Sequence, residues 1–83
     1  MSWAWEYDPS MEYVAAGAPS ALLKEVEKLA DELVRAASAF YLDGTGYQGD
    51  GPKGQDALLP GGMFVYLIVP RHERLYIRQI TAW

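Results

Sequence analysis

The chain has 83 residues, no cysteine and a single histidine, His72, which excludes disulfides and thiolate chemistry and argues against a histidine-based metal site. Its 51% hydrophobic and 22% charged residues are the balance of a folded protein rather than a disordered one. No apolar run is long enough to span a membrane, and the acidic start lacks the basic region of a signal peptide. We therefore expect residues 1–83 to form one domain of a cytoplasmic protein.

The net charge of −4 is divided unevenly along the chain. Residues 1–56 hold ten acidic and four basic side chains, whereas residues 57–83 hold Glu73 and three arginines. Nucleic-acid-binding proteins usually present a basic patch, so only the C-terminal segment favours such a partner. The alternative is that the three arginines are solvated side chains on an exposed strand.

The N-terminal residues predict a strand followed by a short helix. Trp3, Trp5 and Tyr7 alternate with other residues over positions 2–8, which indicates a strand with one aromatic face. Pro9 should end it. Residues 10–16 predict a short helix, with Ser10 as its N-cap and Gly17 at its end.

The clearest element is an amphipathic helix that begins at Pro19-Ser20 and ends near Asp43-Gly44. Apolar residues recur every three or four positions, which predicts that one side of the helix packs on a core. Charged residues occupy the other side, where solvation is their simplest role. The apolar positions are Leu22, Leu23, Val26, Leu29, Ala30, Leu33, Val34, Ala37, Phe40 and Tyr41.

Residues 43–62 contain seven of the eight glycines and predict a long loop. The segment has no Gly-Lys dipeptide, which excludes a Walker phosphate loop. A G-x-G-x-x-G pattern is present, but it follows a helix instead of a strand, which excludes a dinucleotide site. The aspartates are too irregularly spaced for a calcium loop.

The last third predicts a β-hairpin, with strands over 63–69 and Arg74–Ala82 around a polar turn. The first strand is apolar on both faces and should be central in its sheet, and residues 56–59 predict a short extra strand. Strict alternation would place Tyr76, Arg78 and Ile80 on one face of the return strand, with Leu75, Ile77, Gln79 and Thr81 on the other. We predict an α+β fold, a small antiparallel sheet with one or two helices on one face, in the order β-(α)-α-(β)-β-β.

This element order, with Gly62–Val69 and residues 74–80 as its terminal hairpin, resembles the RelE/ParE superfamily of bacterial toxins. The resemblance implies a RelE-like toxin of a type II toxin–antitoxin system, neutralised by a cognate antitoxin protein. RelE-like members cut mRNA on the ribosome without a metal or another cofactor. Basic residues hold the phosphates, and a Tyr, His or Glu helps to move the proton of the attacking ribose 2′-hydroxyl.

Three features depart from the RelE pattern. The central strand starts with Met63-Phe64, where the nucleases commonly carry an arginine, the chain ends without their basic or histidine-containing tail, and it is acidic where they are basic. These departures favour an alternative, a non-enzymatic RelE/ParE-like binding protein that inhibits DNA gyrase or serves only as an antitoxin-binding module. A third alternative is a plain homodimeric α+β domain with no role assigned by the sequence.

The predicted site residues lie in the second half of the chain. Arg78 and Tyr76, two positions apart on one strand, are the candidates to meet a phosphate and a hydroxyl, and Arg74 at the turn completes the predicted catalytic set. For Arg78 and Tyr76 the alternative is an ordinary half-exposed strand face packed against a helix or loop, and for Arg74 it is surface solvation at the turn. The predicted substrate-binding residues, each with surface solvation as the alternative, are Lys53, Arg71, His72 and Tyr47.

Overall fold

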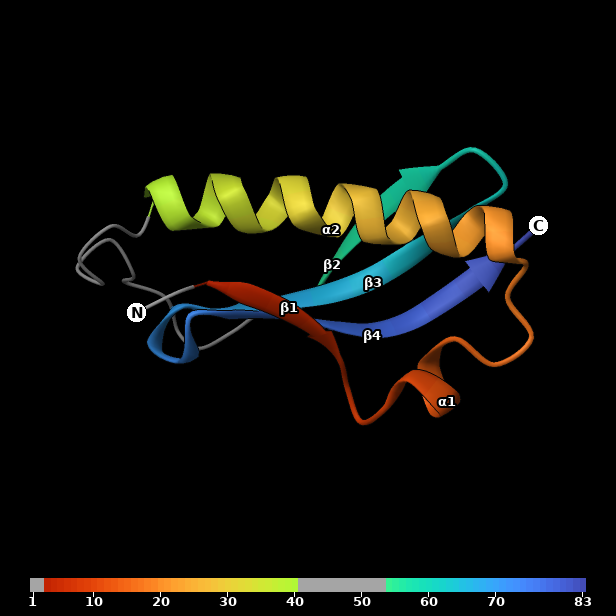
Figure 1. Ribbon diagram of the computed structural model, residues 1–83, viewed down its shortest axis with the longest axis horizontal. Helices are drawn as coiled ribbons and strands as arrows, with labels where there is room; N and C mark the ends of the chain where they lie inside the picture. The colour runs from red at the N-terminus through yellow and green to blue at the C-terminus, as the bar shows by residue number, and fades with distance from the viewer. Residues whose placement is uncertain (1–2, 41–53) are drawn as a thin grey trace.

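The computed structural model describes residues 3–40 and 54–83 of the chain (Figure 1). Within them lie two helices, four strands and a short 3-10 turn in the predicted order. The single turn of 3-10 helix between the last two strands is labelled η1. The bounds are β1 Ala4–Tyr7, α1 Met11–Val14, α2 Ser20–Phe40, β2 Gly54–Leu59, β3 Gly62–Val69, η1 Pro70–His72 and β4 Arg74–Ala82.

The four strands form one mixed sheet in the order β1-β4-β3-β2. The meander β2-β3-β4 is antiparallel, and β3 is central as predicted. The expectation of a purely antiparallel sheet is wrong, because β1 pairs with β4 in parallel. β3 pairs with only one edge of β4. The other edge pairs with β1, which precedes both helices in the sequence and runs in the same direction as β4 (Figure 1).

The chain leaves β1 through Asp8 and a cis peptide bond to Pro9, and the strand ends there as predicted. Helix α1 spans four residues and is shorter than the predicted 10–16. Its N-cap is Ser10, whose Oγ accepts a hydrogen bond from the Tyr13 backbone N–H at 3.2 Å. After α1 the chain passes Gly17, whose φ of +75° suits glycine.

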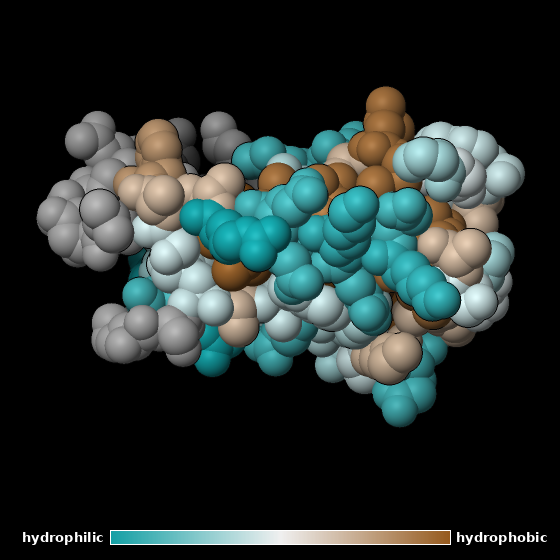
Figure 2. All heavy atoms as spheres, turned by 45° about the horizontal axis from the view of Figure 1, so that its top comes forward, coloured by the Kyte–Doolittle hydropathy of each residue, from teal (hydrophilic) through white to brown (hydrophobic). Residues whose placement is uncertain are grey.

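Helix α2 lies along one face of the sheet (Figure 1) and begins at Ser20, within the predicted Pro19-Ser20 start. Most of the predicted apolar stripe is buried or half-buried, but Phe40 is 70% exposed and does not belong to the core. The predicted end at Asp43-Gly44, Tyr41 and the glycine-rich segment up to Lys53 lie outside the described residues. Hydrophilic side chains gather over the outer surface of α2 (Figure 2), as its charge pattern predicts.

The core lies between α2 and the sheet. Val26 of α2, Phe64 of β3 and Leu75 and Ile77 of β4 have no exposed surface. At the β1 edge, Trp5 Nε1 donates a hydrogen bond to Asp31 on α2 at 2.7 Å, and the Tyr7 hydroxyl donates to Glu27 at 3.1 Å. The aromatic face predicted for the first strand therefore meets the helix, and its polar atoms are paired there.

A β-bulge corrects the predicted faces of β4. Val65 pairs with Gln79 and the next residue, Tyr66, pairs with Ile77, so Arg78 is an extra residue in β4. The extra residue shifts the alternation by one position. Ile80 therefore joins the helix side with Ile77, whereas Gln79 and Thr81 move to the opposite side, which was not the predicted assignment.

Candidate functional site

The predicted catalytic side chains lie on the face of the sheet that points away from α2, here called the open face. Its members follow from the strand register, which pairs Leu67 with Tyr76 and Val65 with Gln79, opposite to the buried Phe64, Leu75 and Ile77. Among residues 3–40 and 54–83, no helix crosses this face (Figure 1). The open face includes Glu6, Asp56, Leu58, Met63, Val65, Leu67, Arg74, Tyr76, Arg78, Gln79 and Thr81.

Tyr76 and His72 form a hydrogen-bonded pair at one end of this face. The Nδ1 atom of His72 lies 2.9 Å from the Tyr76 hydroxyl oxygen, and the two rings are perpendicular. The tight turn makes the contact, because η1 ends at His72 and Glu73 then takes the left-handed conformation with φ of 52° before β4 begins. Which partner donates depends on the protonation of the imidazole. The pair can accept or deliver a proton at the surface.

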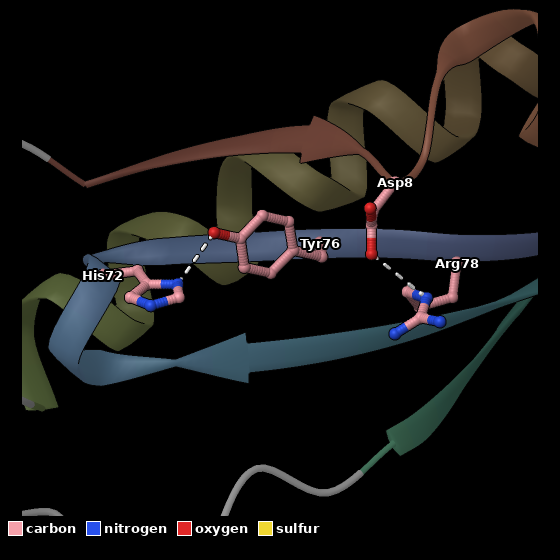
Figure 3. Close-up of polar contacts among 4 residues, drawn as sticks. All are labelled: Asp8, His72, Tyr76 and Arg78. Atoms are coloured by element: carbon pink, nitrogen blue, oxygen red, sulfur yellow. Dashed lines mark hydrogen bonds and ion pairs between the residues drawn. The ribbon is translucent and has the colours of Figure 1, made fainter.

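Arg78 and Asp8 form an ion pair further along β4. The Arg78 Nε lies 3.4 Å from Asp8 Oδ2, and both side chains are about half exposed, at 51% and 43%. Asp8 follows directly after β1, and its backbone N–H donates to the Ile77 carbonyl at 3.0 Å. The parallel β1–β4 pairing therefore brings Asp8 next to Arg78. Figure 3 shows Tyr76 between His72 and the Asp8–Arg78 pair, so that the four side chains follow one another along β4.

The other two arginines of the C-terminal segment lie around the turn. Arg74 is half-buried at the start of β4, and its Nη1 donates to the Glu73 carbonyl at 3.0 Å. Arg71 is an exposed residue of η1. Of the predicted site, the structure thus brings His72 and Tyr76 into contact and places Arg78 on the same face. Lys53 and Tyr47 lie outside the described residues, so their approach to these side chains stays a prediction.

A shallow cleft of about 620 Å³ lies beside Arg78 on the open face. It is lined by Asp8, Pro9, Tyr13, Gly54, Val65, Leu67, Arg78 and Gln79. The predicted site contained only Arg78 of this set. Gln79 was missed because the alternation rule places it on the other face. Tyr13 was missed because nothing in the sequence indicates that α1 borders the sheet. The only available signal for Asp8 was its position at the end of a strand before Pro9.

The shifted tyrosine pKa values belong to the covered face rather than to this site. Burial, with the hydrogen bond to Glu27 and the charge of Glu27, raises the pKa of Tyr7 to about 12. Burial also raises the pKa of Tyr66, whose hydroxyl donates to Gln55 at 3.1 Å. These shifts therefore report on the contact between helix and sheet.

Among the described residues, no group of three or more acidic or histidine side chains could hold a metal ion. Within the same ranges, neither helix has both the length and the apolar character needed to cross a membrane. Comparison of the chain with models of protein families, with curated proteins and with solved structures finds no match.

Proposed function

We propose that this chain is a RelE-like toxin of a type II toxin–antitoxin system, acting in the cytoplasm as a ribosome-dependent mRNA endoribonuclease. The order β-α-α-β-β-β and the hairpin of β3 and β4 support the resemblance at the level of architecture. The proposal includes a cognate antitoxin as its protein partner. Its working surface is the open face.

The observation that carries the proposal is the His72–Tyr76 hydrogen bond on the same face as Arg78. RNA cleavage without a metal needs a group that takes the proton of the 2′-hydroxyl and a cation that stabilises the charge developing on the phosphate. The 2′-oxygen then forms a bond to phosphorus, the bond to the 5′-oxygen breaks, and that oxygen takes up a proton. The His72–Tyr76 pair is suited to the proton transfers, and Arg78 to the phosphate.

Asp8 acts on Arg78 as a positioning residue in this scheme. A guanidinium group has five N–H donors in a rigid fork, and Asp8 faces the Nε side of it. The terminal N–H groups are the natural donors to a phosphate, which they contact in bidentate geometry. Arg74, at the same end of β4, is a second cation within the working surface.

The test is induction of the chain alone in a bacterium, with growth followed while mRNA 5′ ends are mapped. We expect growth arrest with new, codon-phased cuts. Arg78→Ala and Tyr76→Phe should each abolish the cuts, because general acid–base and electrostatic contributions are each worth about 10²-fold or more in rate. Arg35→Ala is the matched control, since Arg35 is an exposed arginine on α2. Cuts that survive both open-face substitutions in a folded protein would refute the assignment.

The second candidate is a non-enzymatic RelE/ParE-like binding protein. The observation in its favour is the apolar character of the open face at the start of β3. Met63 occupies the position where the nucleases commonly carry arginine, and it pairs with Leu58, which is 74% exposed. Growth arrest without mRNA cuts would favour this candidate, with gyrase as the first target to assay. No arrest at all would leave an antitoxin-binding module.

A further inference from the structure

The cleft beside Arg78 has a defined construction. Val65 and Leu67, alternate residues of the central strand β3, are half-buried and form its apolar floor. Gly54 of β2 pairs with Leu67 and bounds the floor on one side. On the other side lie Asp8 and Pro9, from the connection that follows β1, and Tyr13 of α1. The cleft thus spans three neighbouring strands and ends against an aromatic wall.

The β-bulge aims two consecutive polar side chains into this cleft. Because Arg78 and Gln79 both stand opposite Val65, both lie on the open face, although successive strand residues normally alternate. A guanidinium and a carboxamide therefore line the cleft side by side. Bulges often re-aim side chains next to functional sites.

Gly54 leaves room in the cleft, although the backbone conformation at this position does not require a glycine. A Cβ placed on Gly54 would lie 3.7 Å from Val65 Cγ1 and 4.0 Å from the Tyr66 carbonyl oxygen, which are ordinary contacts. A larger side chain could therefore be accommodated by the strand, and it would project into the cleft. Gly54 itself therefore adds no side chain to the space beside Leu67.

We propose that this cleft binds one nucleotide of an RNA strand, with the base on the Val65–Leu67 floor against Tyr13 and with the Gln79 amide contacting the base edge. The inference rests on the proposed function for RNA as the substrate class and adds the subsite that would select the base. The volume of the cleft, about 620 Å³, falls within the range of about 300–1,000 Å³ that is usual for small-molecule pockets.

The lining favours a neutral planar group over a free anion. Among the lining residues that belong to the described ranges 3–40 and 54–83, Arg78 is the only cation, and Asp8 already faces it, so the pair carries little net charge. The floor is apolar, and Tyr13 is 73% exposed, which leaves its ring available for stacking. Gln79 can donate and accept hydrogen bonds at once, as reading of a base edge requires. A nucleobase meets all three conditions, and the phosphate of the same nucleotide can accept hydrogen bonds from Arg78.

The probes are the four nucleoside 5′-monophosphates and, separately, inorganic phosphate, each titrated into the ¹⁵N-labelled chain while backbone amide shifts are followed by NMR. We expect saturable shifts at Gly54, Val65, Leu67 and Gln79 with at least one nucleotide, and weaker ones with phosphate. Gly54→Leu should abolish the shifts by filling the cleft. Tyr13→Ala should raise the dissociation constant at least about fivefold, whereas Tyr13→Phe should retain binding. Arg35→Ala, an exposed position on α2 outside the cleft lining, is the control.

Equal shifts with phosphate and with every nucleotide would overturn the proposal, because they would show an anion site without base contacts. Nucleotide shifts that survive Gly54→Leu in a folded protein, or the absence of shifts with every probe, would overturn it as well. The result is separable from the proposed function. Binding at the cleft without mRNA cuts in the cell would refute the nuclease and keep the subsite, whereas cuts that depend on Arg78 and Tyr76 without nucleotide binding would do the reverse.

Discussion

The two faces of the sheet are built from the same strands and differ in what they bury. On the side of α2, Phe64, Leu75 and Ile77 have no exposed surface, and the polar atoms of Trp5 and Tyr7 are paired with helix carboxylates. On the open face, Tyr76 and Arg78 alternate with them along β4 but keep polar partners, His72 and Asp8, at the surface. One face buries apolar side chains, and the other keeps its polar side chains at the surface.

The difference indicates that stability and function can be changed separately in this chain. Burial of apolar surface is the dominant favourable contribution to folding, and it is concentrated on the covered face. Half-exposed ion pairs and hydrogen bonds contribute little. Substitutions on the open face should therefore change the proposed activity without unfolding the protein.

Phe64→Ala should have the largest effect. The ring is fully buried against α2, and removing such a side chain costs about 3–5 kcal/mol through lost transfer energy and the cavity left behind. A domain of this size has a total stability of only about 4–12 kcal/mol, so much of it should be lost. Urea denaturation followed by circular dichroism measures the change.

Val65→Ala is the matched control for Phe64→Ala, since Val65 is the next residue of β3 but is half-buried on the open face. It should cost clearly less. Equal losses for the two variants would show that the open face is buried as deeply as the other, and would contradict the comparison.

The periodicity of the sequence predicted most of the fold. The stripe from Leu22 to Ala37 indicated α2 and its buried side, and the apolar run of β3 indicated a central strand, because these patterns follow directly from burial. The parallel pairing of β1 could not be predicted, since it depends on which sheet edge is left after the meander forms. Phe40 was misassigned because periodicity does not say where the sheet beneath a helix ends.

The candidate site was predicted only in part. The prediction that Tyr76 and Arg78 share one face is correct. The His72–Tyr76 contact depends on the left-handed backbone conformation of Glu73, which glutamate does not favour and the sequence therefore does not predict. The bulge moved Gln79 to the open face, against simple alternation. Asp8 reaches Arg78 through a pairing between distant segments. Local patterns predict local structure, whereas this site is assembled by non-local contacts.

Gly62→Ala should have the next largest effect, because Gly62 lies at the covered side of the hairpin. A Cβ there would collide with the backbone carbonyl oxygen of Thr81 and approach Leu22 Cδ2 to 2.9 Å. The backbone atom cannot move cheaply, so we expect a loss of about 1–3 kcal/mol, as for other overpacked cores.

Gly54→Ala provides the comparison for Gly62→Ala on the open face. Its Cβ would make only ordinary contacts, and the reduced freedom of the unfolded chain should stabilise the protein by up to about 1 kcal/mol. Thermal denaturation of the two variants in parallel measures both effects. A greater loss for Gly54→Ala than for Gly62→Ala would reverse the assignment of the two faces.

Tyr7→Phe should have a smaller effect that depends on pH. It removes the hydrogen bond to Glu27, worth about 1 kcal/mol. Because the pKa of Tyr7 is raised to about 12 in the folded state, the unfolded chain releases this proton first, near pH 10. The stabilisation is therefore complete below pH 10 and is lost as the pH rises from 10 to 12.

The measurement for Tyr7→Phe is the unfolding free energy between pH 8 and pH 12, scanned in about one-unit steps. The variant should lose less stability over the alkaline range than the parent chain. Tyr13→Phe, an exposed position on α1, is the control and should follow the parent. Parallel curves for Tyr7→Phe and the parent would show that the Tyr7 hydroxyl is solvated rather than held against α2.

Asp8→Asn should have the smallest effect on stability. The pair with Arg78 is about half exposed on both sides, and such pairs contribute at most about 1 kcal/mol and are screened by salt. The backbone hydrogen bond from Asp8 to Ile77 is kept in the variant, so the end of β1 should stay in place. Chemical denaturation at low and at high salt measures the contribution. A small, salt-sensitive loss means that a change in the proposed activity caused by Asp8→Asn or Arg78→Ala would arise at the open face and not from unfolding of the chain. A loss above about 2 kcal/mol would instead show that the pair supports the β1–β4 junction, and loss of the proposed activity in Arg78→Ala would then reflect unfolding.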